Sequence, residues 1–272
     1  CRHCDDVVDG QTLGHDQDAA RRGDGQQALR RLRAYTAQAC SGADIDELPF
    51  AALQEVVREF QIPARYPAEH LDGFAMDVQE QRYTTLQDTL RYCYHVAGVV
   101  GIMMSHVMGA KDPVVLDRAC DLGLAFQLTN IARDLVEDAT AGRCYVPQQW
   151  LDELGLDRAT LGEPANRQAL AVIAARLVET AEAYYASARL GIAALPPRSA
   201  WAVATAHDVY REIGLQVRAL GPRAWDQRVS TSTLQKLRML GSGGALAYRA
   251  RRAPDVPRSR PAELWQRSSR AD

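Results

Sequence analysis

The feature that most constrains this chain is a line of four polar residues on an otherwise apolar helix. Residues 113–138 carry no Gly-Pro break and are expected to form one long helix. At about 100° per residue, four polar side chains of this helix fall on one narrow stripe: Gln127, Asn130, Asp134 and Asp138. A helix that is apolar on its other sides is buried, so this stripe is expected to point into the protein.

Burial of this stripe needs a compensating partner. Two amides and two carboxylates buried without partners would cost several kcal/mol, on the order of the stability of a whole domain. A divalent cation is the simplest compensation. The alternative is that Asp134 and Asp138 lie on a solvated face, as most aspartates do.

A second pair of aspartates stands at the start of the chain. Asp5 and Asp9 are one helical turn apart, with Arg2 on the same face. Like charges at this spacing destabilise a bare helix by about 0.2–0.5 kcal/mol per pair, so two pairs in one chain indicate a cation between them. Oxygen ligands without a His-Cys cluster suit Mg²⁺ or Mn²⁺ better than zinc. Because Mg²⁺ prefers few carboxylates plus substrate phosphates, the two turns together indicate a diphosphate clamp.

At this point four motifs together resemble those of the squalene/phytoene synthase family. They are Arg2 with Asp5-Asp6-Val7-Val8-Asp9, the Tyr92–Gly101 stretch, the Gln127–Asp138 stretch, and Gly142-Arg143-Cys144-Tyr145-Val146-Pro147. Either aspartate motif alone would be weak evidence, but the combination is highly specific. The resemblance spans about residues 1–240 and is closest to the bacterial members that form phytoene.

The resemblance implies both a fold and a reaction. The fold is all-α, a single-domain isoprenoid-synthase-type helical bundle with a central cavity. The reaction is a prenyl transfer that joins two geranylgeranyl diphosphates head to head into 15-cis-phytoene, through prephytoene diphosphate, with release of two diphosphates. The implied cofactor is Mg²⁺ or Mn²⁺, and no nicotinamide cofactor is expected.

The resemblance also assigns roles to residues of this chain. The implied catalytic carboxylates are Asp5, Asp9, Asp134 and Asp138. The same four, together with Asn130, are the implied metal ligands. The residues implied to bind substrate are Arg2, Tyr92, Gln127, Arg133, Tyr210 and Arg228.

Three rival interpretations accompany this one. A squalene or dehydrosqualene synthase would use the same motifs on farnesyl diphosphate, because cavity depth sets chain length and sequence does not show it. A non-catalytic helical scaffold derived from the family is disfavoured by the intact aspartate pairs. A di-iron carboxylate bundle is excluded because the chain contains no Glu-x-x-His.

Composition and charge further limit the class of protein, its binding partners and its location. With 272 residues, of which 47% are hydrophobic and 24% charged, the chain has ample material for a globular core. A net charge of −2 and the lack of a recognisable motif give no indication of nucleic-acid binding. Six cysteines without a small-scaffold spacing indicate reduced thiols and a cytoplasmic location. The chain begins inside a motif, so we expect that it lacks some N-terminal residues.

Helical periodicity predicts six further helices and no strand. One holds Leu71, Phe74, Ala75 and Val78, and the approximate ranges of the other five are 25–40, 49–61, 86–108, 166–190 and 199–220. Gly98 and Gly101 lie about one turn apart in the predicted helix 86–108. They would either allow close helix packing or leave a trough for an isoprenoid tail.

The composition changes near residue 241. Residues 1–240 are predicted to form the synthase domain, and residues 241–272 a disordered basic tail rich in Pro and Arg. Seven arginines against three acidic residues give the tail a charge of +4, which leaves about −6 for the rest of the chain. Such a tail could hold the protein at an anionic membrane, at about 1 kcal/mol per basic residue, or could simply be solvated.

Overall fold

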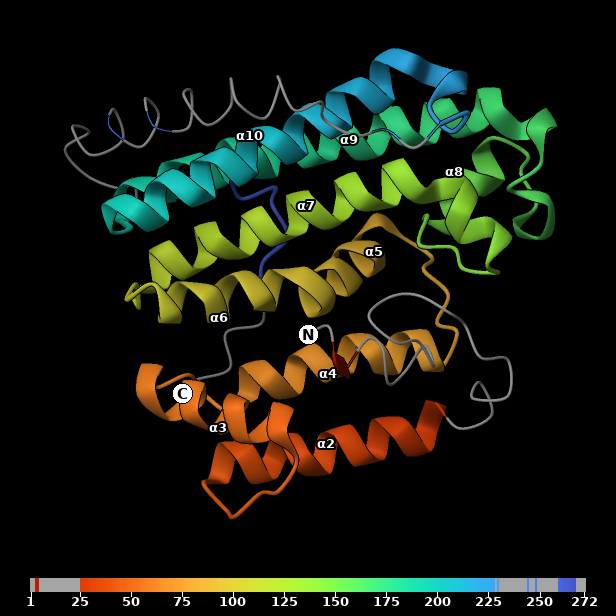
Figure 1. The fold of residues 1–272 in the computed structure, drawn as a ribbon. Helices are drawn as coiled ribbons and strands as arrows, with labels where there is room; N and C mark the ends of the chain where they lie inside the picture. Colours follow the sequence, from red (N-terminus) through yellow and green to blue (C-terminus); the bar gives the residue numbers. More distant parts are fainter. Residues whose placement is uncertain are drawn as a thin grey trace. The chain divides into compact units, whose positions relative to one another are not determined.

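All regular secondary structure in the described part of the chain is helical (Figure 1). The structure is a computed structural model that describes residues 3–4, 25–227, 229, 244, 248 and 259–267. No strand occurs among these residues, so the prediction of an all-α fold is confirmed. The contacts divide the chain into two compact units, residues 1–81 and 82–272.

Between residues 25 and 81, unit 1 contains three helices: α2 (Gly25–Ser41), α3 (Leu48–Phe60) and α4 (Arg65–Val78). Helix α2 packs against the other two around a small apolar core. Helix α3 has Pro49 in its first turn, where a missing N–H leaves no bond unmade, and it ends at Gln61 in the left-handed conformation (φ 54°). The predicted boundaries of α2 and α3 are correct to one residue.

Unit 2 is larger and holds the remaining helices. Its α-helices are α5 (Leu86–Cys93), α6 (Val99–Val107), α7 (Pro113–Thr140), α8 (Gln148–Glu153), α9 (Arg167–Gly191) and α10 (Pro197–Leu220), and the π-turn η2 (Tyr94–Gly98) joins α5 to α6. Its short 3₁₀ turns are η3 (Arg158–Thr160), η4 (Pro164–Asn166), η5 (Ile192–Ala194) and η6 (Gly221–Arg223). The sequence predicted these α-helices except α8, which has only six residues and is too short for a helical repeat of apolar residues to stand out.

Helix α7 is the central element of unit 2 (Figure 1). It packs most extensively against α9, and it also contacts α5, η2, α6 and α10. The helix begins where Asp112 Oδ1 accepts the Val114 N–H at 2.8 Å and Pro113 takes the first position. It runs for 28 residues without interruption, two residues beyond the predicted end. Because its apolar residues are buried on several sides, the helix is surrounded as the sequence predicted.

Glycines bring other helices into very close contact with α7. A Cβ placed on Gly101 would lie 2.4 Å from the carbonyl oxygen of Ala119, and one on Gly123 would lie 2.4 Å from that of Ala97. At the far end of α9, a Cβ on Gly191 would lie 2.5 Å from Arg118 Cβ. Of the two roles considered for the glycines at 98 and 101, the structure supports close helix packing.

Residues 86–107 form one helical rod with a π-turn in its middle, where the sequence predicted a continuous helix. The rod begins with a capping box, in which Thr85 Oγ1 accepts the Asp88 N–H and the Asp88 carboxylate accepts the Thr85 N–H at 2.9 Å. These bonds to Thr85 hold the pKa of Asp88 below its usual value. The π-turn, η2, is of a type found mostly as single turns inside α-helices and frequently at functional sites.

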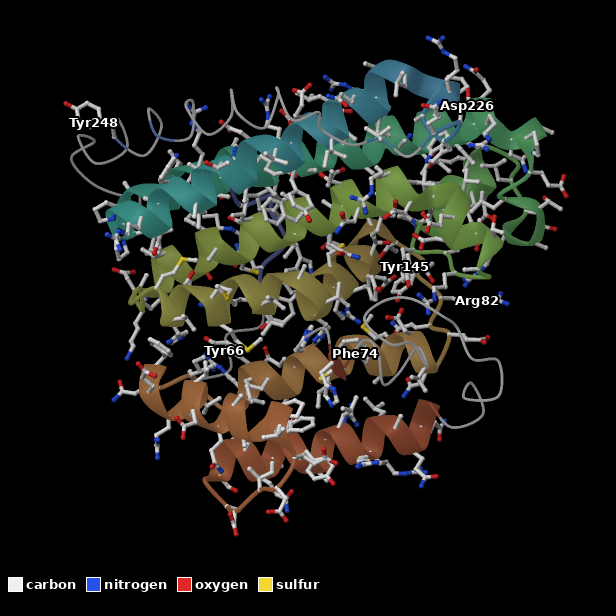
Figure 2. All side chains as sticks on the ribbon, in the orientation of Figure 1. Tyr66, Phe74, Arg82, Tyr145, Asp226 and Tyr248 are labelled. Carbon is white, nitrogen blue, oxygen red and sulfur yellow. The ribbon has the colours of Figure 1, made fainter. Side chains whose placement is uncertain are left out.

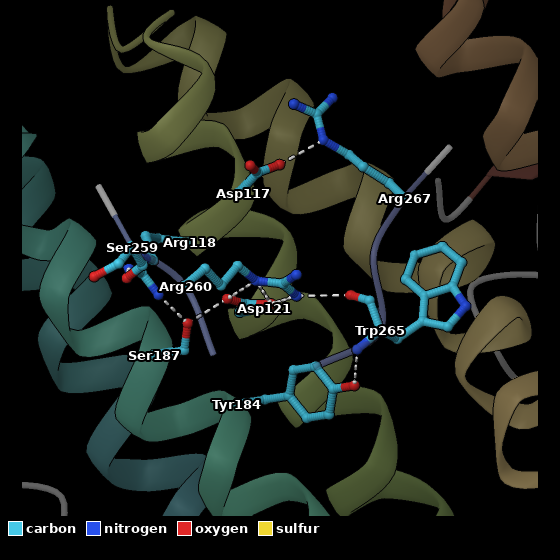
Figure 3. Close-up of polar contacts among 9 residues, drawn as sticks. All are labelled: Asp117, Arg118, Asp121, Tyr184, Ser187, Ser259, Arg260, Trp265 and Arg267. Atoms are coloured by element: carbon cyan, nitrogen blue, oxygen red, sulfur yellow. Dashed lines mark hydrogen bonds and ion pairs between the residues drawn. The ribbon is translucent and has the colours of Figure 1, made fainter. Parts of the chain in front are cut away.

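Residues 259–267 belong to the predicted C-terminal tail and are described by the structure. This segment packs on α7 and α9, with Leu264 buried and Arg260 paired with Asp121 (Figure 3). The composition is polar and proline-rich, but Arg260 pairs with the buried Asp121 and Arg267 with the half-buried Asp117, partners that the local sequence does not reveal. The boundary near residue 240 stays a prediction.

Within the described ranges, no helix combines the length and the apolar character that crossing a bilayer requires.

Candidate functional site

The predicted polar stripe runs along the C-terminal half of α7. Its four residues Gln127, Asn130, Asp134 and Asp138 are all half-buried, so the stripe is partly shielded from solvent. Asn130 Nδ2 donates to Gln127 Oε1 at 3.4 Å, which joins the first two members of the stripe. The helix therefore presents amide and carboxylate oxygens on one side, one turn apart.

Asn130 carries a buried acceptor that nothing in the described part of the chain satisfies. Its Oδ1 has no hydrogen-bond partner there. A buried acceptor without a partner costs about 1–3 kcal/mol and calls for an explanation. An amide oxygen is a suitable ligand for a hard divalent cation, so Asn130 fits the metal-ligand role that the sequence predicted.

Asp134 is paired with its neighbour in the chain. Arg133 donates from Nε to one carboxylate oxygen at 2.8 Å and from Nη2 to the other at 2.5 Å. Both side chains are largely buried, with 16% and 19% of their surface exposed. The hydrogen bonds to Asp134 raise the pKa of Arg133, although burial acts in the opposite direction. The two-bond geometry makes this a strong, directional ion pair.

Tyr210 stands beside this pair. It comes from α10, and its ring stacks on Phe126 of α7 with the centroids 4.3 Å apart. It is also near enough to Arg133 to contribute to the raised pKa of that guanidinium. The structure thus brings Tyr210 together with Arg133 and Asp134, three residues that the sequence predicted to share a site.

Two motifs that carried the family resemblance meet at the start of the helical rod. Tyr92 stacks on Tyr145 with centroids 4.5 Å apart and an angle of 16°, and Tyr83 lies 5.5 Å from Tyr92. Thr89 Oγ1 donates to the Tyr145 carbonyl at 2.9 Å. Tyr92 is therefore a buried member of an aromatic cluster, and its predicted contact with substrate stays a prediction.

A pocket of about 770 Å³ opens at the C-terminal end of α7. Figure 2 labels Arg82 at this end of unit 2, and Arg143 and Arg158 also line the pocket. Asp138 is close by, because it directly precedes the lining residue Ala139 in α7. Three guanidinium groups against one lining carboxylate, that of Asp157, favour an anion here. Sequence reasoning quoted Arg143 within a motif but missed Arg82 and Arg158, and no local signal marks either of them.

Four predicted site residues lie outside the described residues: Arg2, Asp5, Asp9 and Arg228. In the part of the chain that the structure does describe, no group of three or more His, Cys, Asp or Glu side chains could hold a metal ion. The predicted ligand set needs Asp5 and Asp9 in addition to α7, so it stays a prediction.

A histidine next to an aspartate on α10 has a structural role. His207 Nδ1 lies 2.9 Å from Asp208 Oδ1, and its Nε2 lies 3.1 Å from the carbonyl oxygen of Tyr185. Tyr185 and Thr129 share a hydrogen bond of 2.9 Å between their hydroxyls, and burial raises the pKa of Tyr185. These hydrogen bonds join α7, α9 and α10.

The chain is similar in sequence to known proteins over nearly its whole length. A family model described as squalene/phytoene synthase matches residues 1–235. The chain is 56% identical over 269 residues to a 15-cis-phytoene synthase of Pantoea ananas, a match that covers 98% of this chain and 86% of the relative. It is 51% identical over 271 residues to a 15-cis-phytoene synthase of Paracoccus sp., covering 100% of this chain and 87% of the relative.

Solved structures agree on the fold. A dehydrosqualene synthase crystallised with a ligand superposes with a TM-score of 0.79 at 26% identity, covering 92% of this chain and 84% of that chain. A squalene synthase from Alicyclobacillus acidocaldarius superposes with a TM-score of 0.71 at 24% identity, covering 81% and 80%.

Proposed function

Because the chain belongs to the squalene/phytoene synthase family, we propose that it condenses two geranylgeranyl diphosphates head to head into 15-cis-phytoene, as a prenyltransferase of carotenoid biosynthesis. The observation that carries the choice of product is the 51–57% identity, over nearly the whole chain, to relatives named 15-cis-phytoene synthase. The proposed intermediate is prephytoene diphosphate, and two diphosphates are released.

The proposed cofactor is Mg²⁺, or Mn²⁺ in its place. The residues that would hold it are Asp5, Asp9, Asn130, Asp134 and Asp138. The unsatisfied Oδ1 of Asn130, one turn from Asp134, supports this assignment from the side of α7. Bound metal would supply positive charge against the leaving diphosphate, and electrostatic stabilisation of this kind usually contributes more to catalysis than any other single effect.

The diphosphate contacts are proposed to come from Arg2, Gln127, Arg133 and Arg228. The pairing of Arg133 with Asp134 fits this role, because the two charges neutralise each other when no substrate is bound. If the Asp134 carboxylate binds the metal cation instead of Arg133, the Arg133 guanidinium would be able to donate hydrogen bonds to a diphosphate oxygen. Tyr210, beside Arg133, would line the same place, and Tyr92 is proposed to contact substrate through the aromatic cluster at the start of the rod.

The proposed location is the cytoplasm, with peripheral contact to a membrane through the basic tail. Phytoene is a hydrocarbon, so it must leave the enzyme for an apolar phase. Two of the seven tail arginines, Arg260 and Arg267, are engaged in ion pairs with α7. Fewer arginines are therefore free for lipid headgroups than the sequence suggested.

A squalene-type reaction on farnesyl diphosphate is the second candidate, and the observation that favours it is the similarity to a dehydrosqualene synthase. The test is to incubate the protein with labelled geranylgeranyl diphosphate or farnesyl diphosphate, with and without Mg²⁺, and to identify the lipid product. Metal-dependent phytoene without added nicotinamide cofactor is the expected result. Turnover of farnesyl diphosphate alone would move the assignment to the second candidate, and turnover of neither would favour a non-catalytic scaffold.

A further inference from the structure

Asp121 is a fully buried carboxylate on α7, far from the polar stripe. None of its side-chain surface is exposed, and burial raises its pKa despite its partners. A buried charge is tolerated only when it is paired and hydrogen-bonded. The Ser187 hydroxyl of α9 donates to one oxygen of Asp121, and Arg260 binds both oxygens through Nε and Nη2. The main counter-charge of this carboxylate therefore comes from the C-terminal segment.

Arg118 lies one turn before Asp121 on α7 and belongs to the same cluster as Asp121, Ser187 and Arg260. Its Nη1 donates to Ser187 Oγ at 2.5 Å, and its Nη2 donates to the Ser259 carbonyl at 2.8 Å. The same buried network thus holds both a side chain and a backbone carbonyl of the segment (Figure 3). Asp121, Arg118 and Arg260 together carry a formal charge of +1, so Asp121 keeps one cation near it if Arg260 leaves.

The rest of the segment makes contacts along its whole length. Arg260 Nη2 donates to the Trp265 carbonyl at 2.7 Å, which folds the segment on itself. The Trp265 N–H donates to the Tyr184 hydroxyl at 2.9 Å, and the Trp265 ring lies 5.2 Å from that of Tyr94. Arg267 Nε donates to Asp117 at 2.7 Å. The segment therefore joins α7, α9 and η2.

These contacts are made to the first third of α7, where glycines also let neighbouring helices approach it closely. Gly191 allows α9 to approach Arg118 of α7, and Gly123 of α7 allows Ala97 of η2 to approach in the same region. Asp121 and Asp134 are 13 residues apart on one unbroken helix, about 20 Å along its axis. A close-packed helix transmits a shift or rotation at one end to the other.

We propose that residues 259–267 form a C-terminal strap that docks on Asp121 through Arg260 and holds α7 where Asn130 and Asp134 can serve the metal site. Asp121 and Arg260 are then positioning residues, since neither touches substrate. The proposal rests on the proposed function for the identity of the metal site. It is tested in the full chain with Arg260→Gln, with Arg260→Lys, and with Glu263→Gln as the control, because Glu263 is exposed and lies in the same segment.

The first measurement is docking itself, by limited trypsin digestion and mass spectrometry of the cut after Arg267. In the docked strap Arg267 is paired with Asp117 and 19% exposed, so cleavage is slow. We expect Arg260→Gln to speed this cut and Glu263→Gln to leave it unchanged. An unchanged rate in Arg260→Gln would overturn the role of Arg260 as anchor.

The second measurement is Mn²⁺ binding in the presence of inorganic diphosphate, followed by electron paramagnetic resonance without turnover. We expect the half-saturating Mn²⁺ concentration to rise on the order of tenfold in Arg260→Gln, a size typical of energetic coupling between distant sites. Arg260→Lys should fall between, because lysine keeps the charge but cannot bind both oxygens in fork geometry. Glu263→Gln should match the parent chain.

The outcomes distinguish a failure of the strap proposal from a failure of the proposed function. Faster cleavage with unchanged Mn²⁺ binding in Arg260→Gln would overturn the positioning role. A parent chain that binds Mn²⁺ and diphosphate but forms no phytoene would overturn the proposed product alone, while a weakened Arg260→Gln in that chain would still support the strap.

Discussion

Gly123→Ala should destabilise the protein although alanine is the better helix former. The new Cβ would lie 2.4 Å from the Ala97 carbonyl oxygen, 2.6 Å from its carbon and 2.7 Å from Gly98 Cα. Carbon and oxygen normally approach to about 3.3 Å, so α7 and the helical rod must separate by almost 1 Å. All three obstructing atoms belong to the backbone, so no side-chain rotation can relieve the clash.

The magnitude follows from two opposing effects. Replacing glycine in a helix gains about 0.5–1 kcal/mol, and overpacking costs typically about 1–3 kcal/mol and occasionally more. Because rigid backbone is displaced, the upper end of the cost applies, and we expect a net loss of about 2 kcal/mol. That is a substantial part of the roughly 5–15 kcal/mol by which domains are stable.

Gly214→Ala is the matched control for this experiment. Gly214 also lies in a long helix, but the nearest atom to its added Cβ is Thr129 Oγ1 at 3.5 Å, an ordinary contact. The measurement is the urea midpoint of unfolding by far-ultraviolet circular dichroism. Gly123→Ala should unfold at lower urea than the parent, and Gly214→Ala at equal or higher urea. A Gly123→Ala protein as stable as the parent would refute the close-approach reasoning.

Three further predictions follow from the site and the core. Asp134→Asn should lower the rate of phytoene formation on the order of 10²–10³-fold without changing the circular dichroism spectrum, because it removes a carboxylate proposed to hold the cation that offsets the charge of the leaving diphosphate; near-normal turnover would contradict the metal assignment. Tyr185→Phe should cost about 1–3 kcal/mol, measured as a lower melting temperature, because the Thr129 hydroxyl loses its buried partner; an unchanged melting temperature would mean that water replaces it. Thr85→Ala should cost about 1 kcal/mol at pH 7. Part of this cost is the hydrogen bond that the Thr85 hydroxyl donates to the Asp88 carboxylate, while the backbone N–H of Thr85, the main cause of the lowered pKa of Asp88, remains in the variant. The share of the hydroxyl is present above the unfolded pKa of Asp88 and lost as the pH falls through the folded pKa, so the cost should be smaller at about pH 3.5 than at pH 7, and equal urea midpoint shifts at the two pH values would argue against it.

Periodicity predicted α7 well because both of its determinants are local. Asp112 and Pro113 mark its start, and the polar stripe repeats at helical spacing on an apolar background. The same stripe led to Asn130 and Asp134 as candidates for one site. The pairing of Arg133 with Asp134 was not predicted, because neighbouring residues on a helix point about 100° apart and only a long side chain curls back.

The parts that the sequence did not reveal depend on partners far along the chain. Arg260 meets Asp121 across 139 residues, so composition alone assigned that segment to a solvated tail. Arg82 joins Arg143 and Arg158 in one pocket only after the chain has folded.

The π-turn in the rod also affects how sequences of this family should be compared. A π-turn takes one residue more than an α-turn, so residues after Gly98 are rotated by about 100° from their place in an unbroken helix. The two halves of the rod thus have separate helical phases, one presenting Thr89 and Tyr92 to Tyr145, the other presenting Gly101 to Ala119. A one-residue gap within 94–98 in an alignment would change which residues meet α7. A relative without the extra residue must carry its small residues one position away from those seen here.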